Sequence, residues 1–234
     1  MIRWKNNKIL FFRVNKTINI LNNKWFALLF LAIAFSLIYN PLTKFPYTFC
    51  IIVLFILVTT YLQEGNLNRL NFKKLGLKEL KAILLVYVGL ELVMDFLFQP
   101  TVSWLCNEPA DYSTFESIKG NIGMYFKYLL YMWISAAFGE ELLFRGYAFF
   151  QFQKIFGDKK GLIVLLSAVL FSLPHLYQGL SGLIMTFLFG IAFALIYSKY
   201  QNIWINIIIH GLIDTVFLTL SYLGYLEFYN LLGK

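Results

Sequence analysis

The sequence predicts an all-α membrane protein, a polytopic bundle of seven transmembrane helices. Three observations support this fold class. Of the 234 residues, 59% are hydrophobic and only 14% are charged, whereas soluble domains are about half apolar and about a quarter charged. The apolar residues form long blocks and lack the spaced stripes of a half-buried surface. The basic residues fall between these blocks, as they do in proteins oriented by a bilayer.

Seven apolar stretches are long enough to cross a bilayer, which takes roughly 20 residues of helix. Helices are expected because the backbone must satisfy its own hydrogen bonds in lipid, and no stretch shows the alternation of a barrel strand. The links are short, so residues 25–234 are expected to form one transmembrane domain with its motif-bearing core at about 122–224. The expected spans are 25–43, 45–63, 79–99, 122–150, 161–177, 180–198 and 203–224.

The Lys and Arg residues predict the orientation of these spans. With a basic cytoplasmic tail at 1–24, fifteen of the 20 basic residues fall on the inner side and four on the outer side, and Arg145 lies within a span. Such an excess is typical of cytoplasmic loops. The tail after residue 224 is nearly uncharged, so it gives only weak support for an external C-terminus. An eighth, short membrane segment could lie in this tail.

The charge of +8 forms no basic face, so nucleic acid is not an expected partner. Membrane lipids are expected partners instead. Cys50 and Cys106 match no metal-binding spacing. The abundance of Lys, Asn, Ile, Phe and Tyr together with short loops suits a multi-pass protein of a bacterial cell membrane.

Eight ionisable residues lie inside the expected spans, where each costs on the order of 2.5–3.5 kcal/mol on insertion scales. Such residues indicate a functional site, although a single buried histidine is more often a hydrogen-bonded core residue. The chain's two histidines are both in the set. Its members are Glu91, Asp95, Glu140, Glu141, Arg145, His175, His210 and Asp214.

Three of the spans carry such residues four positions apart, and one of these pairs is Glu91 with Asp95. Glu141 and Arg145 share a helix face and are expected to form a structural ion pair. Glu140 is rotated by about 100° from Glu141 and is left over, unless both glutamates compete for Arg145. His210 and Asp214 also share a face, which suits either a hydrogen-bonded pair or two metal ligands.

His175 follows Pro174 at the end of its span, and counting along the spans places it at a different depth from His210. A kink, a tilt or a re-entrant stretch near 175–182 would bring the two together. Glu140, His175, His210 and Asp214 could then meet in one polar cavity. Such a set can activate water and stabilise an oxyanion, which is the chemistry of peptide-bond hydrolysis.

At these residues the chain resembles the type II CAAX prenyl endopeptidases and their bacterial relatives, the CAAX protease and bacteriocin-processing (CPBP, or Abi) family of intramembrane proteases. The family pattern is Glu-Glu-x-x-x-Arg, Phe-x-x-x-His and His-x-x-x-Asn/Asp on successive helices. The chain has Glu140-Glu141…Arg145, Phe171…His175 and His210…Asp214 in that order.

The resemblance implies that Glu140 activates water, that His175 assists, and that His210 and Asp214 stabilise the oxyanion. An ionised Asp214 cannot donate a hydrogen bond to an oxyanion as Asn can, so its expected role is then to orient His210. No cofactor is expected. The alternative is Zn²⁺ held by Glu140, His175 and His210, although His-Glu-x-x-His is absent. The implied substrate is a membrane-associated protein or peptide, with peptide processing or bacteriocin immunity as bacterial roles.

Two other interpretations remain open. Gly179-Leu180-Ser181-Gly182 resembles the Gly-x-Ser-Gly of rhomboid serine proteases, with His210 as a base, but small residues also pack membrane helices. The second is a non-catalytic immunity or scaffold protein, or a transporter that moves protons through Glu91 and Asp95. These two acids could instead pair with Arg145 or line the same cavity as the protease motifs.

Overall fold

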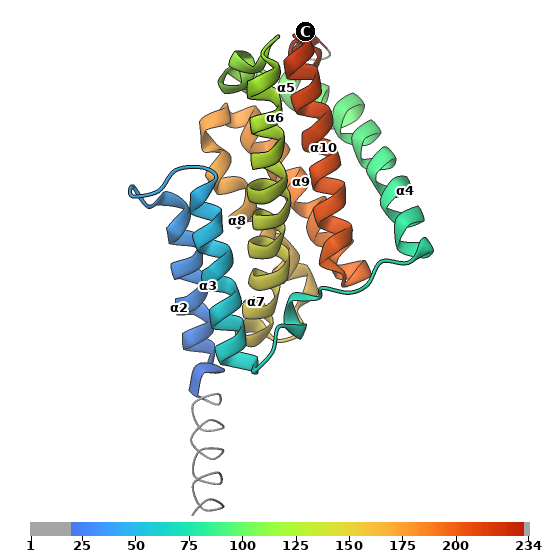
Figure 1. Ribbon diagram of the computed structural model, residues 1–234. Helices are drawn as coiled ribbons and strands as arrows, with labels where there is room; N and C mark the ends of the chain where they lie inside the picture. The colour runs from blue at the N-terminus through green and yellow to red at the C-terminus, as the bar shows by residue number, and fades with distance from the viewer. Residues whose placement is uncertain (1–19, 232–234) are drawn as a thin grey trace, which may run out of the picture.

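The computed structural model describes residues 20–231, and within that range the chain is helical without a strand (Figure 1). The all-α prediction is therefore confirmed. Residues 1–19 of the predicted basic tail lie outside the described residues. The helices are α2 (Lys24–Ser36), α3 (Tyr47–Glu64), α4 (Leu77–Val93), α5 (Gln99–Cys106), α6 (Ile122–Tyr131), α7 (Ala148–Phe156), α8 (Lys160–Ser172), α9 (Gly179–Tyr200), α10 (Ile203–Leu223) and α11 (Phe228–Leu231).

Three helical stretches are long and apolar enough to cross a membrane: Tyr47–Glu64, Lys160–Tyr200 and Ile203–Leu223. The helix Lys24–Tyr39 is apolar but shorter. After α10, the described chain continues only into α11, whose four residues are too short to cross a bilayer. The number of spans stays a prediction, while the membrane character agrees with the sequence.

The stretch Lys160–Tyr200 is a hairpin of two limbs, α8 and α9. The chain reverses at Gly179, whose φ of +77° is a conformation that glycine adopts without steric cost. Farther along, the backbone of Gly190 lies against Ala168: a Cβ added to Gly190 would be 3.0 Å from the Ala168 Cα. The two limbs therefore pack closely because α9 has no side chain at this position.

Within residues 20–231, three π-helical turns interrupt other long helical stretches. Met94–Phe98 joins α4 to α5, whereas Met132–Glu140 and Leu142–Tyr147 lie between α6 and α7. The sequence predicts a single regular helix over 122–150, so the structure differs in local winding. Such turns are often found at functional sites, and these ones contain Asp95, Glu140 and Arg145, with Glu141 directly between two of them.

The loops meet in two groups at opposite ends of the bundle. One group lies where α3 and α7 end, at the lower end of Figure 1. There Lys154 Nζ of α7 lies 2.8 Å from Glu64 Oε1 of α3, and the loop after α3 contacts the start of α10, where Ile203 N donates to Asn71 O at 3.1 Å. At the other end, Asp111 N donates to Gln178 O, and Gly120 N to Tyr222 O, both at 2.9 Å. The lower end corresponds to the predicted cytoplasmic side.

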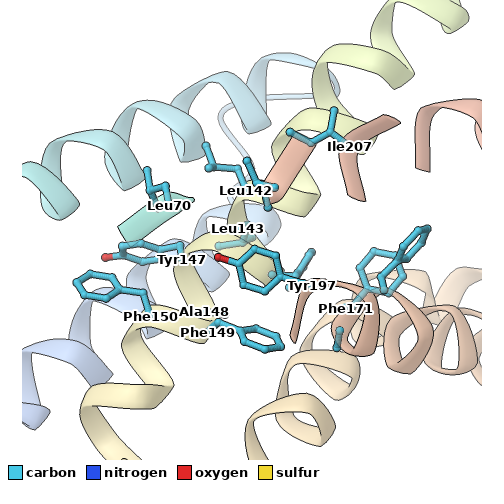
Figure 2. Packing of buried hydrophobic residues seen from close by; sticks show 14 of the residues in the cluster. Leu70, Leu142, Leu143, Tyr147, Ala148, Phe149, Phe150, Phe171, Tyr197 and Ile207 are labelled. Atoms are coloured by element: carbon cyan, nitrogen blue, oxygen red, sulfur yellow. The ribbon is translucent and has the colours of Figure 1, made fainter. Parts of the chain in front are cut away.

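The interior of the bundle is filled by aromatic and aliphatic side chains. Tyr147, Phe149 and Tyr197 lie together in this cluster (Figure 2), and both tyrosine hydroxyls have partners: Thr59 Oγ1 at 2.9 Å and Asn71 Nδ2 at 2.7 Å. The outer faces carry large exposed apolar side chains instead of charges. Such faces suit contact with lipid; examples are Leu54, Leu84, Leu85, Leu130 and Leu195.

Candidate active site

One cavity of about 500 Å³ opens among the helices. Its wall includes residues of α3, α4, α6, α9 and α10, of the π-helical turn before Glu141 and of the turn after α8. Aromatic side chains form much of this wall, and no Lys or Arg of the described residues lies on it. The acidic and histidine residues that line it are Glu91, Asp95, Glu140, His175, His210 and Asp214.

Glu141 and Arg145 lie behind this wall, in the protein core. Arg145 Nη1 is 2.9 Å from Glu141 Oε1, and both side chains are fully buried. Arg145 Nη2 also donates to Gly190 O at 3.3 Å. Its guanidinium carbon lies 4.1 Å from the ring centroid of Phe171 and 5.1 Å from that of Phe193. The contact that the four-residue spacing predicts is therefore present and extends to a carbonyl and two rings.

Glu140 is oriented away from this ion pair. Its side chain is half-buried and lies on the cavity wall. In the described range, the ion pairs of the cluster involve Glu141 and Asp214, and none involves Glu140. Neighbouring positions on a helix point in different directions, so one glutamate faces the core while the other faces the cavity.

His210 contacts carboxylates through both ring nitrogens. Nδ1 lies 2.9 Å from Glu141 Oε1, and it must donate there because an ionised carboxylate only accepts. Nε2 lies 3.6 Å from Asp214 Oδ2, which lines the cavity. The imidazole stacks on Phe193, with centroids 5.0 Å apart and rings inclined by 21°. Glu141 therefore binds both Arg145 and His210. The sequence predicts its contact with Arg145 but not its contact with His210.

His175 reaches the same cavity from a tightened turn. After α8, the chain forms a 3₁₀ helix, Leu173–Gln178, that contains Pro174 and His175. His175 Nδ1 lies 3.1 Å from Phe171 O, so in the neutral ring Nδ1 carries the proton and Nε2 is an acceptor. The Phe171 ring lies 5.5 Å from His175 and 6.0 Å from His210 between centroids. Both histidines therefore lie near the Phe171 ring, although the sequence places them at different depths along their spans.

Two residues of this cluster were missed at the sequence level, Phe193 and Asn206. Asn206 is fully buried, and its Nδ2 donates to Glu141 Oε2 at 3.2 Å and to Phe193 O at 2.8 Å. One signal was available: Asn206 is a polar residue four positions before His210 in an apolar helix. The ionisable residues of the spans do not include it, because an amide carries no charge. Phe193 gives no signal among many phenylalanines.

The donor set offers little to a metal ion. Within residues 20–231, no group of three or more His, Cys, Asp or Glu side chains is arranged to hold one. Both nitrogens of His210 already face carboxylates. The three residues of the zinc alternative, Glu140, His175 and His210, therefore share the cavity without forming a ligand set.

The residues of the other interpretations are also placed. Glu91 and Asp95 line the same cavity as the protease motifs, whereas the ion pair of Arg145 is with Glu141. Ser181 is fully buried, and its hydroxyl has no hydrogen-bond partner in the described chain. It does not lie on the cavity wall, which removes support from a rhomboid-like serine nucleophile.

Comparison with known proteins agrees with the motifs. Residues 123–216 match the protein family described as type II CAAX prenyl endopeptidase Rce1-like. The matched range contains all three motifs, from Glu140 to Asp214, and confirms the resemblance seen in the sequence. No curated protein and no solved structure gives a significant match.

Proposed function

Because residues 123–216 carry the Rce1-like domain of the type II CAAX prenyl endopeptidases, we propose that the chain is an intramembrane endopeptidase that works by glutamate-activated water. The observation that carries the proposal is the divergence of Glu140 and Glu141. Glu141 is held in the core by Arg145 and His210, whereas Glu140 lines the cavity. One carboxylate therefore organises the site, and the other is available to a substrate.

Glu140 acts as the general base in this proposal. Its carboxylate takes a proton from a water molecule while the water oxygen attacks the carbonyl carbon of the scissile peptide bond. A tetrahedral intermediate with a negatively charged oxygen forms. The same proton then passes from Glu140 to the leaving nitrogen, and the C–N bond breaks. Proton transfer of this kind contributes about 10²–10⁴-fold to a rate.

The two histidines divide the remaining work. His175 Nε2 is an acceptor in the neutral ring, since Nδ1 donates to Phe171 O, so it can hold the attacking water beside Glu140. His210 Nε2 lies on the cavity side, and with a proton it can donate to the oxyanion. Asp214 Oδ2, 3.6 Å from Nε2, orients the imidazole, because an ionised carboxylate cannot donate.

The cavity wall supports an apolar, membrane-associated substrate. Phe45, Phe49, Phe115 and Phe217 line it, and side chains of this kind bury apolar substrate groups. We propose a membrane-proximal protein or peptide as substrate and a bacterial cell membrane as the location, with peptide or bacteriocin processing and self-immunity as the roles. The ionisable residues on the cavity wall favour an enzyme over a purely structural scaffold. Ionisable side chains inside an apolar bundle cost free energy and therefore usually mark a functional site.

The test is a comparison of wild type with Glu140→Gln, which is nearly isosteric but cannot accept the proton. Peptidomics of cells that carry either form identifies the peptide that depends on Glu140. Purified protein in detergent should then cleave that peptide about 10²–10⁴-fold more slowly after the substitution. His175→Ala and His210→Ala should lose comparable activity, with strongly non-additive losses in combination.

Two controls complete this experiment. Ser181→Ala should keep full activity, and its inactivation would favour the rhomboid-like interpretation. Dialysis against a chelator should leave cleavage intact, and a loss that added zinc restores would favour the metal alternative. Retained cleavage in Glu140→Gln would overturn the assignment of the base. A Glu140→Gln protein that keeps its cellular function would favour a non-catalytic immunity or scaffold protein.

A further inference from the structure

The face of α10 that carries His210 and Asp214 carries another polar side chain one turn earlier. Asn206, His210 and Asp214 follow at intervals of four residues and so share one helix face. Asn206 is fully buried, and a buried amide is costly unless it is hydrogen-bonded. None of the three sequence motifs includes this residue.

The contacts of Asn206 connect α10 with the glutamate motif and α9. Nδ2 donates to Glu141 Oε2 at 3.2 Å and to Phe193 O at 2.8 Å. The other carboxylate oxygen, Glu141 Oε1, lies 2.9 Å from Arg145 Nη1 and 2.9 Å from His210 Nδ1. Donors therefore approach both oxygens of one buried carboxylate.

Asn206 binds Glu141 Oε2, the carboxylate oxygen that Arg145 and His210 leave free. Among the described residues, it is the one side-chain donor at Oε2, since Arg145 and His210 both contact Oε1. The terminal torsion of a glutamate has a broad, roughly two-fold energy profile. Without a donor at Oε2, the carboxylate plane could turn, and the imidazole bound to Oε1 would turn with it.

We propose that Asn206 is a positioning residue of the active site. By binding Glu141 Oε2 it sets the direction of Oε1, and Oε1 aligns the His210 imidazole so that Nε2 faces the cavity. The catalytic value of this alignment rests on the proposed protease function of His210. The alignment itself is a property of the folded protein and can be measured without a substrate.

Nuclear magnetic resonance of the imidazoles provides that measurement, because the chain has only two histidines. Protein labelled with nitrogen-15 histidine gives one pair of ring-nitrogen signals for each histidine, and His175→Gln assigns the pairs. Asn206→Leu removes the amide at nearly constant volume. We expect it to shift the His210 Nδ1 signal and the signal of its bound proton, and to leave His175 unchanged. Asn206→Ala should give the same shift and serves if the leucine variant does not fold.

Asn202→Leu is the matched control. Asn202 is also a buried asparagine of this helix, at its N-cap, where it accepts from Trp204 N and donates to Lys74 O. Its loss should weaken the helix start and leave both histidine signals in place. An unchanged His210 signal in folded Asn206→Leu would overturn the positioning role, and so would an equal shift in Asn202→Leu.

Kinetics separate this role from the proposed function. On the peptide found by the Glu140 comparison, Asn206→Leu should lower kcat about 10- to 100-fold with little change in KM, the range of one hydrogen bond to a charged group. In a His210→Ala background it should add no further loss, because both substitutions act through one imidazole. If the His210 signal shifts but wild type cleaves nothing, the protease function fails and the positioning role stands.

Discussion

At the residue scale, the most constrained side chain of the site is that of Arg145. Its guanidinium is fully buried between two aromatic rings and contacts one carboxylate and one backbone carbonyl. A buried ion pair contributes little net stability, because desolvation offsets the attraction. Removing one partner is different, since it leaves an uncompensated charge in the core.

The expected consequence is a loss of folded protein in Arg145→Ala and Glu141→Ala. Each should destabilise the protein by about 3–5 kcal/mol, measured as the yield of monodisperse protein in detergent and as its thermal unfolding. Arg69→Ala is the matched control, because the Arg69 side chain is 60% exposed in its 3.3 Å pair with Glu64, and a pair with an exposed partner is worth about 0–1 kcal/mol. Glu140→Gln should also fold normally. Equal yields for all four variants would contradict the structural role of the pair.

The sequence indicated the ionisable residues of the site but not their full set of contacts. Charges in an apolar helix are visible because they are costly in lipid, and all eight lie on the cavity wall or directly behind it. Contacts within one helix, such as Glu141 with Arg145, follow from spacing. The contact of Glu141 with His210 depends on how two helices pack, which no single-helix period contains.

At the scale of the elements, the packing of α8 against α9 determines the position of the Arg145 guanidinium. Gly190 lies against the backbone of Ala168, and its carbonyl accepts from Arg145 Nη2. Small residues allow membrane helices to approach closely. The same glycine therefore allows α8 and α9 to pack closely and supplies a hydrogen-bond acceptor to the buried guanidinium.

Gly190→Ala should separate these limbs. The new Cβ would lie 3.0 Å from Ala168 Cα and 3.1 Å from Ala168 O, and backbone atoms cannot turn aside as a side chain can. Overpacking of this kind costs about 1–3 kcal/mol, and thermal unfolding in detergent measures it. Gly89→Ala in α4 is the control, since nothing lies within 4 Å of its Cβ. A Gly190→Ala protein as stable as this control would contradict the prediction, because α8 and α9 would then accommodate the added methyl group without strain.

The helical elements themselves were largely predictable, and their local winding was not. Each of the seven expected stretches contains helix, because long apolar runs have no other stable form in lipid. The π-helical turns around Asp95 and Glu140 differ from a regular helix by small changes in hydrogen bonding. Apolar periodicity does not report such changes when nearly every residue is apolar.

At the scale of the whole molecule, polar contacts gather at the two ends of the bundle. At the end predicted to be cytoplasmic, Lys154 of α7 contacts Glu64 at the end of α3, and Asn71 of the following loop contacts Ile203 at the start of α10. The loop around Asp111 contacts Gln178 at the other end. The structure thus places the ends of α3 and α7 near each other and the loop after α3 beside the start of α10, in agreement with the charge asymmetry of the sequence.

Cysteine labelling of intact cells tests this arrangement. With Cys50 and Cys106 replaced by Ser, single cysteines are placed at Lys73 and Asp158 for one end and at Lys44 and Asp111 for the other, all of them exposed. A membrane-impermeant maleimide should label the second pair in intact cells and the first pair only after permeabilisation, because Lys and Arg favour the cytoplasmic side. Labelling of all four after lysis is the control. If Lys73 and Asp158 differed in accessibility, the two loops would lie on opposite sides of the membrane and the arrangement of the bundle would be wrong, whereas a joint reversal of both pairs would invert only the orientation.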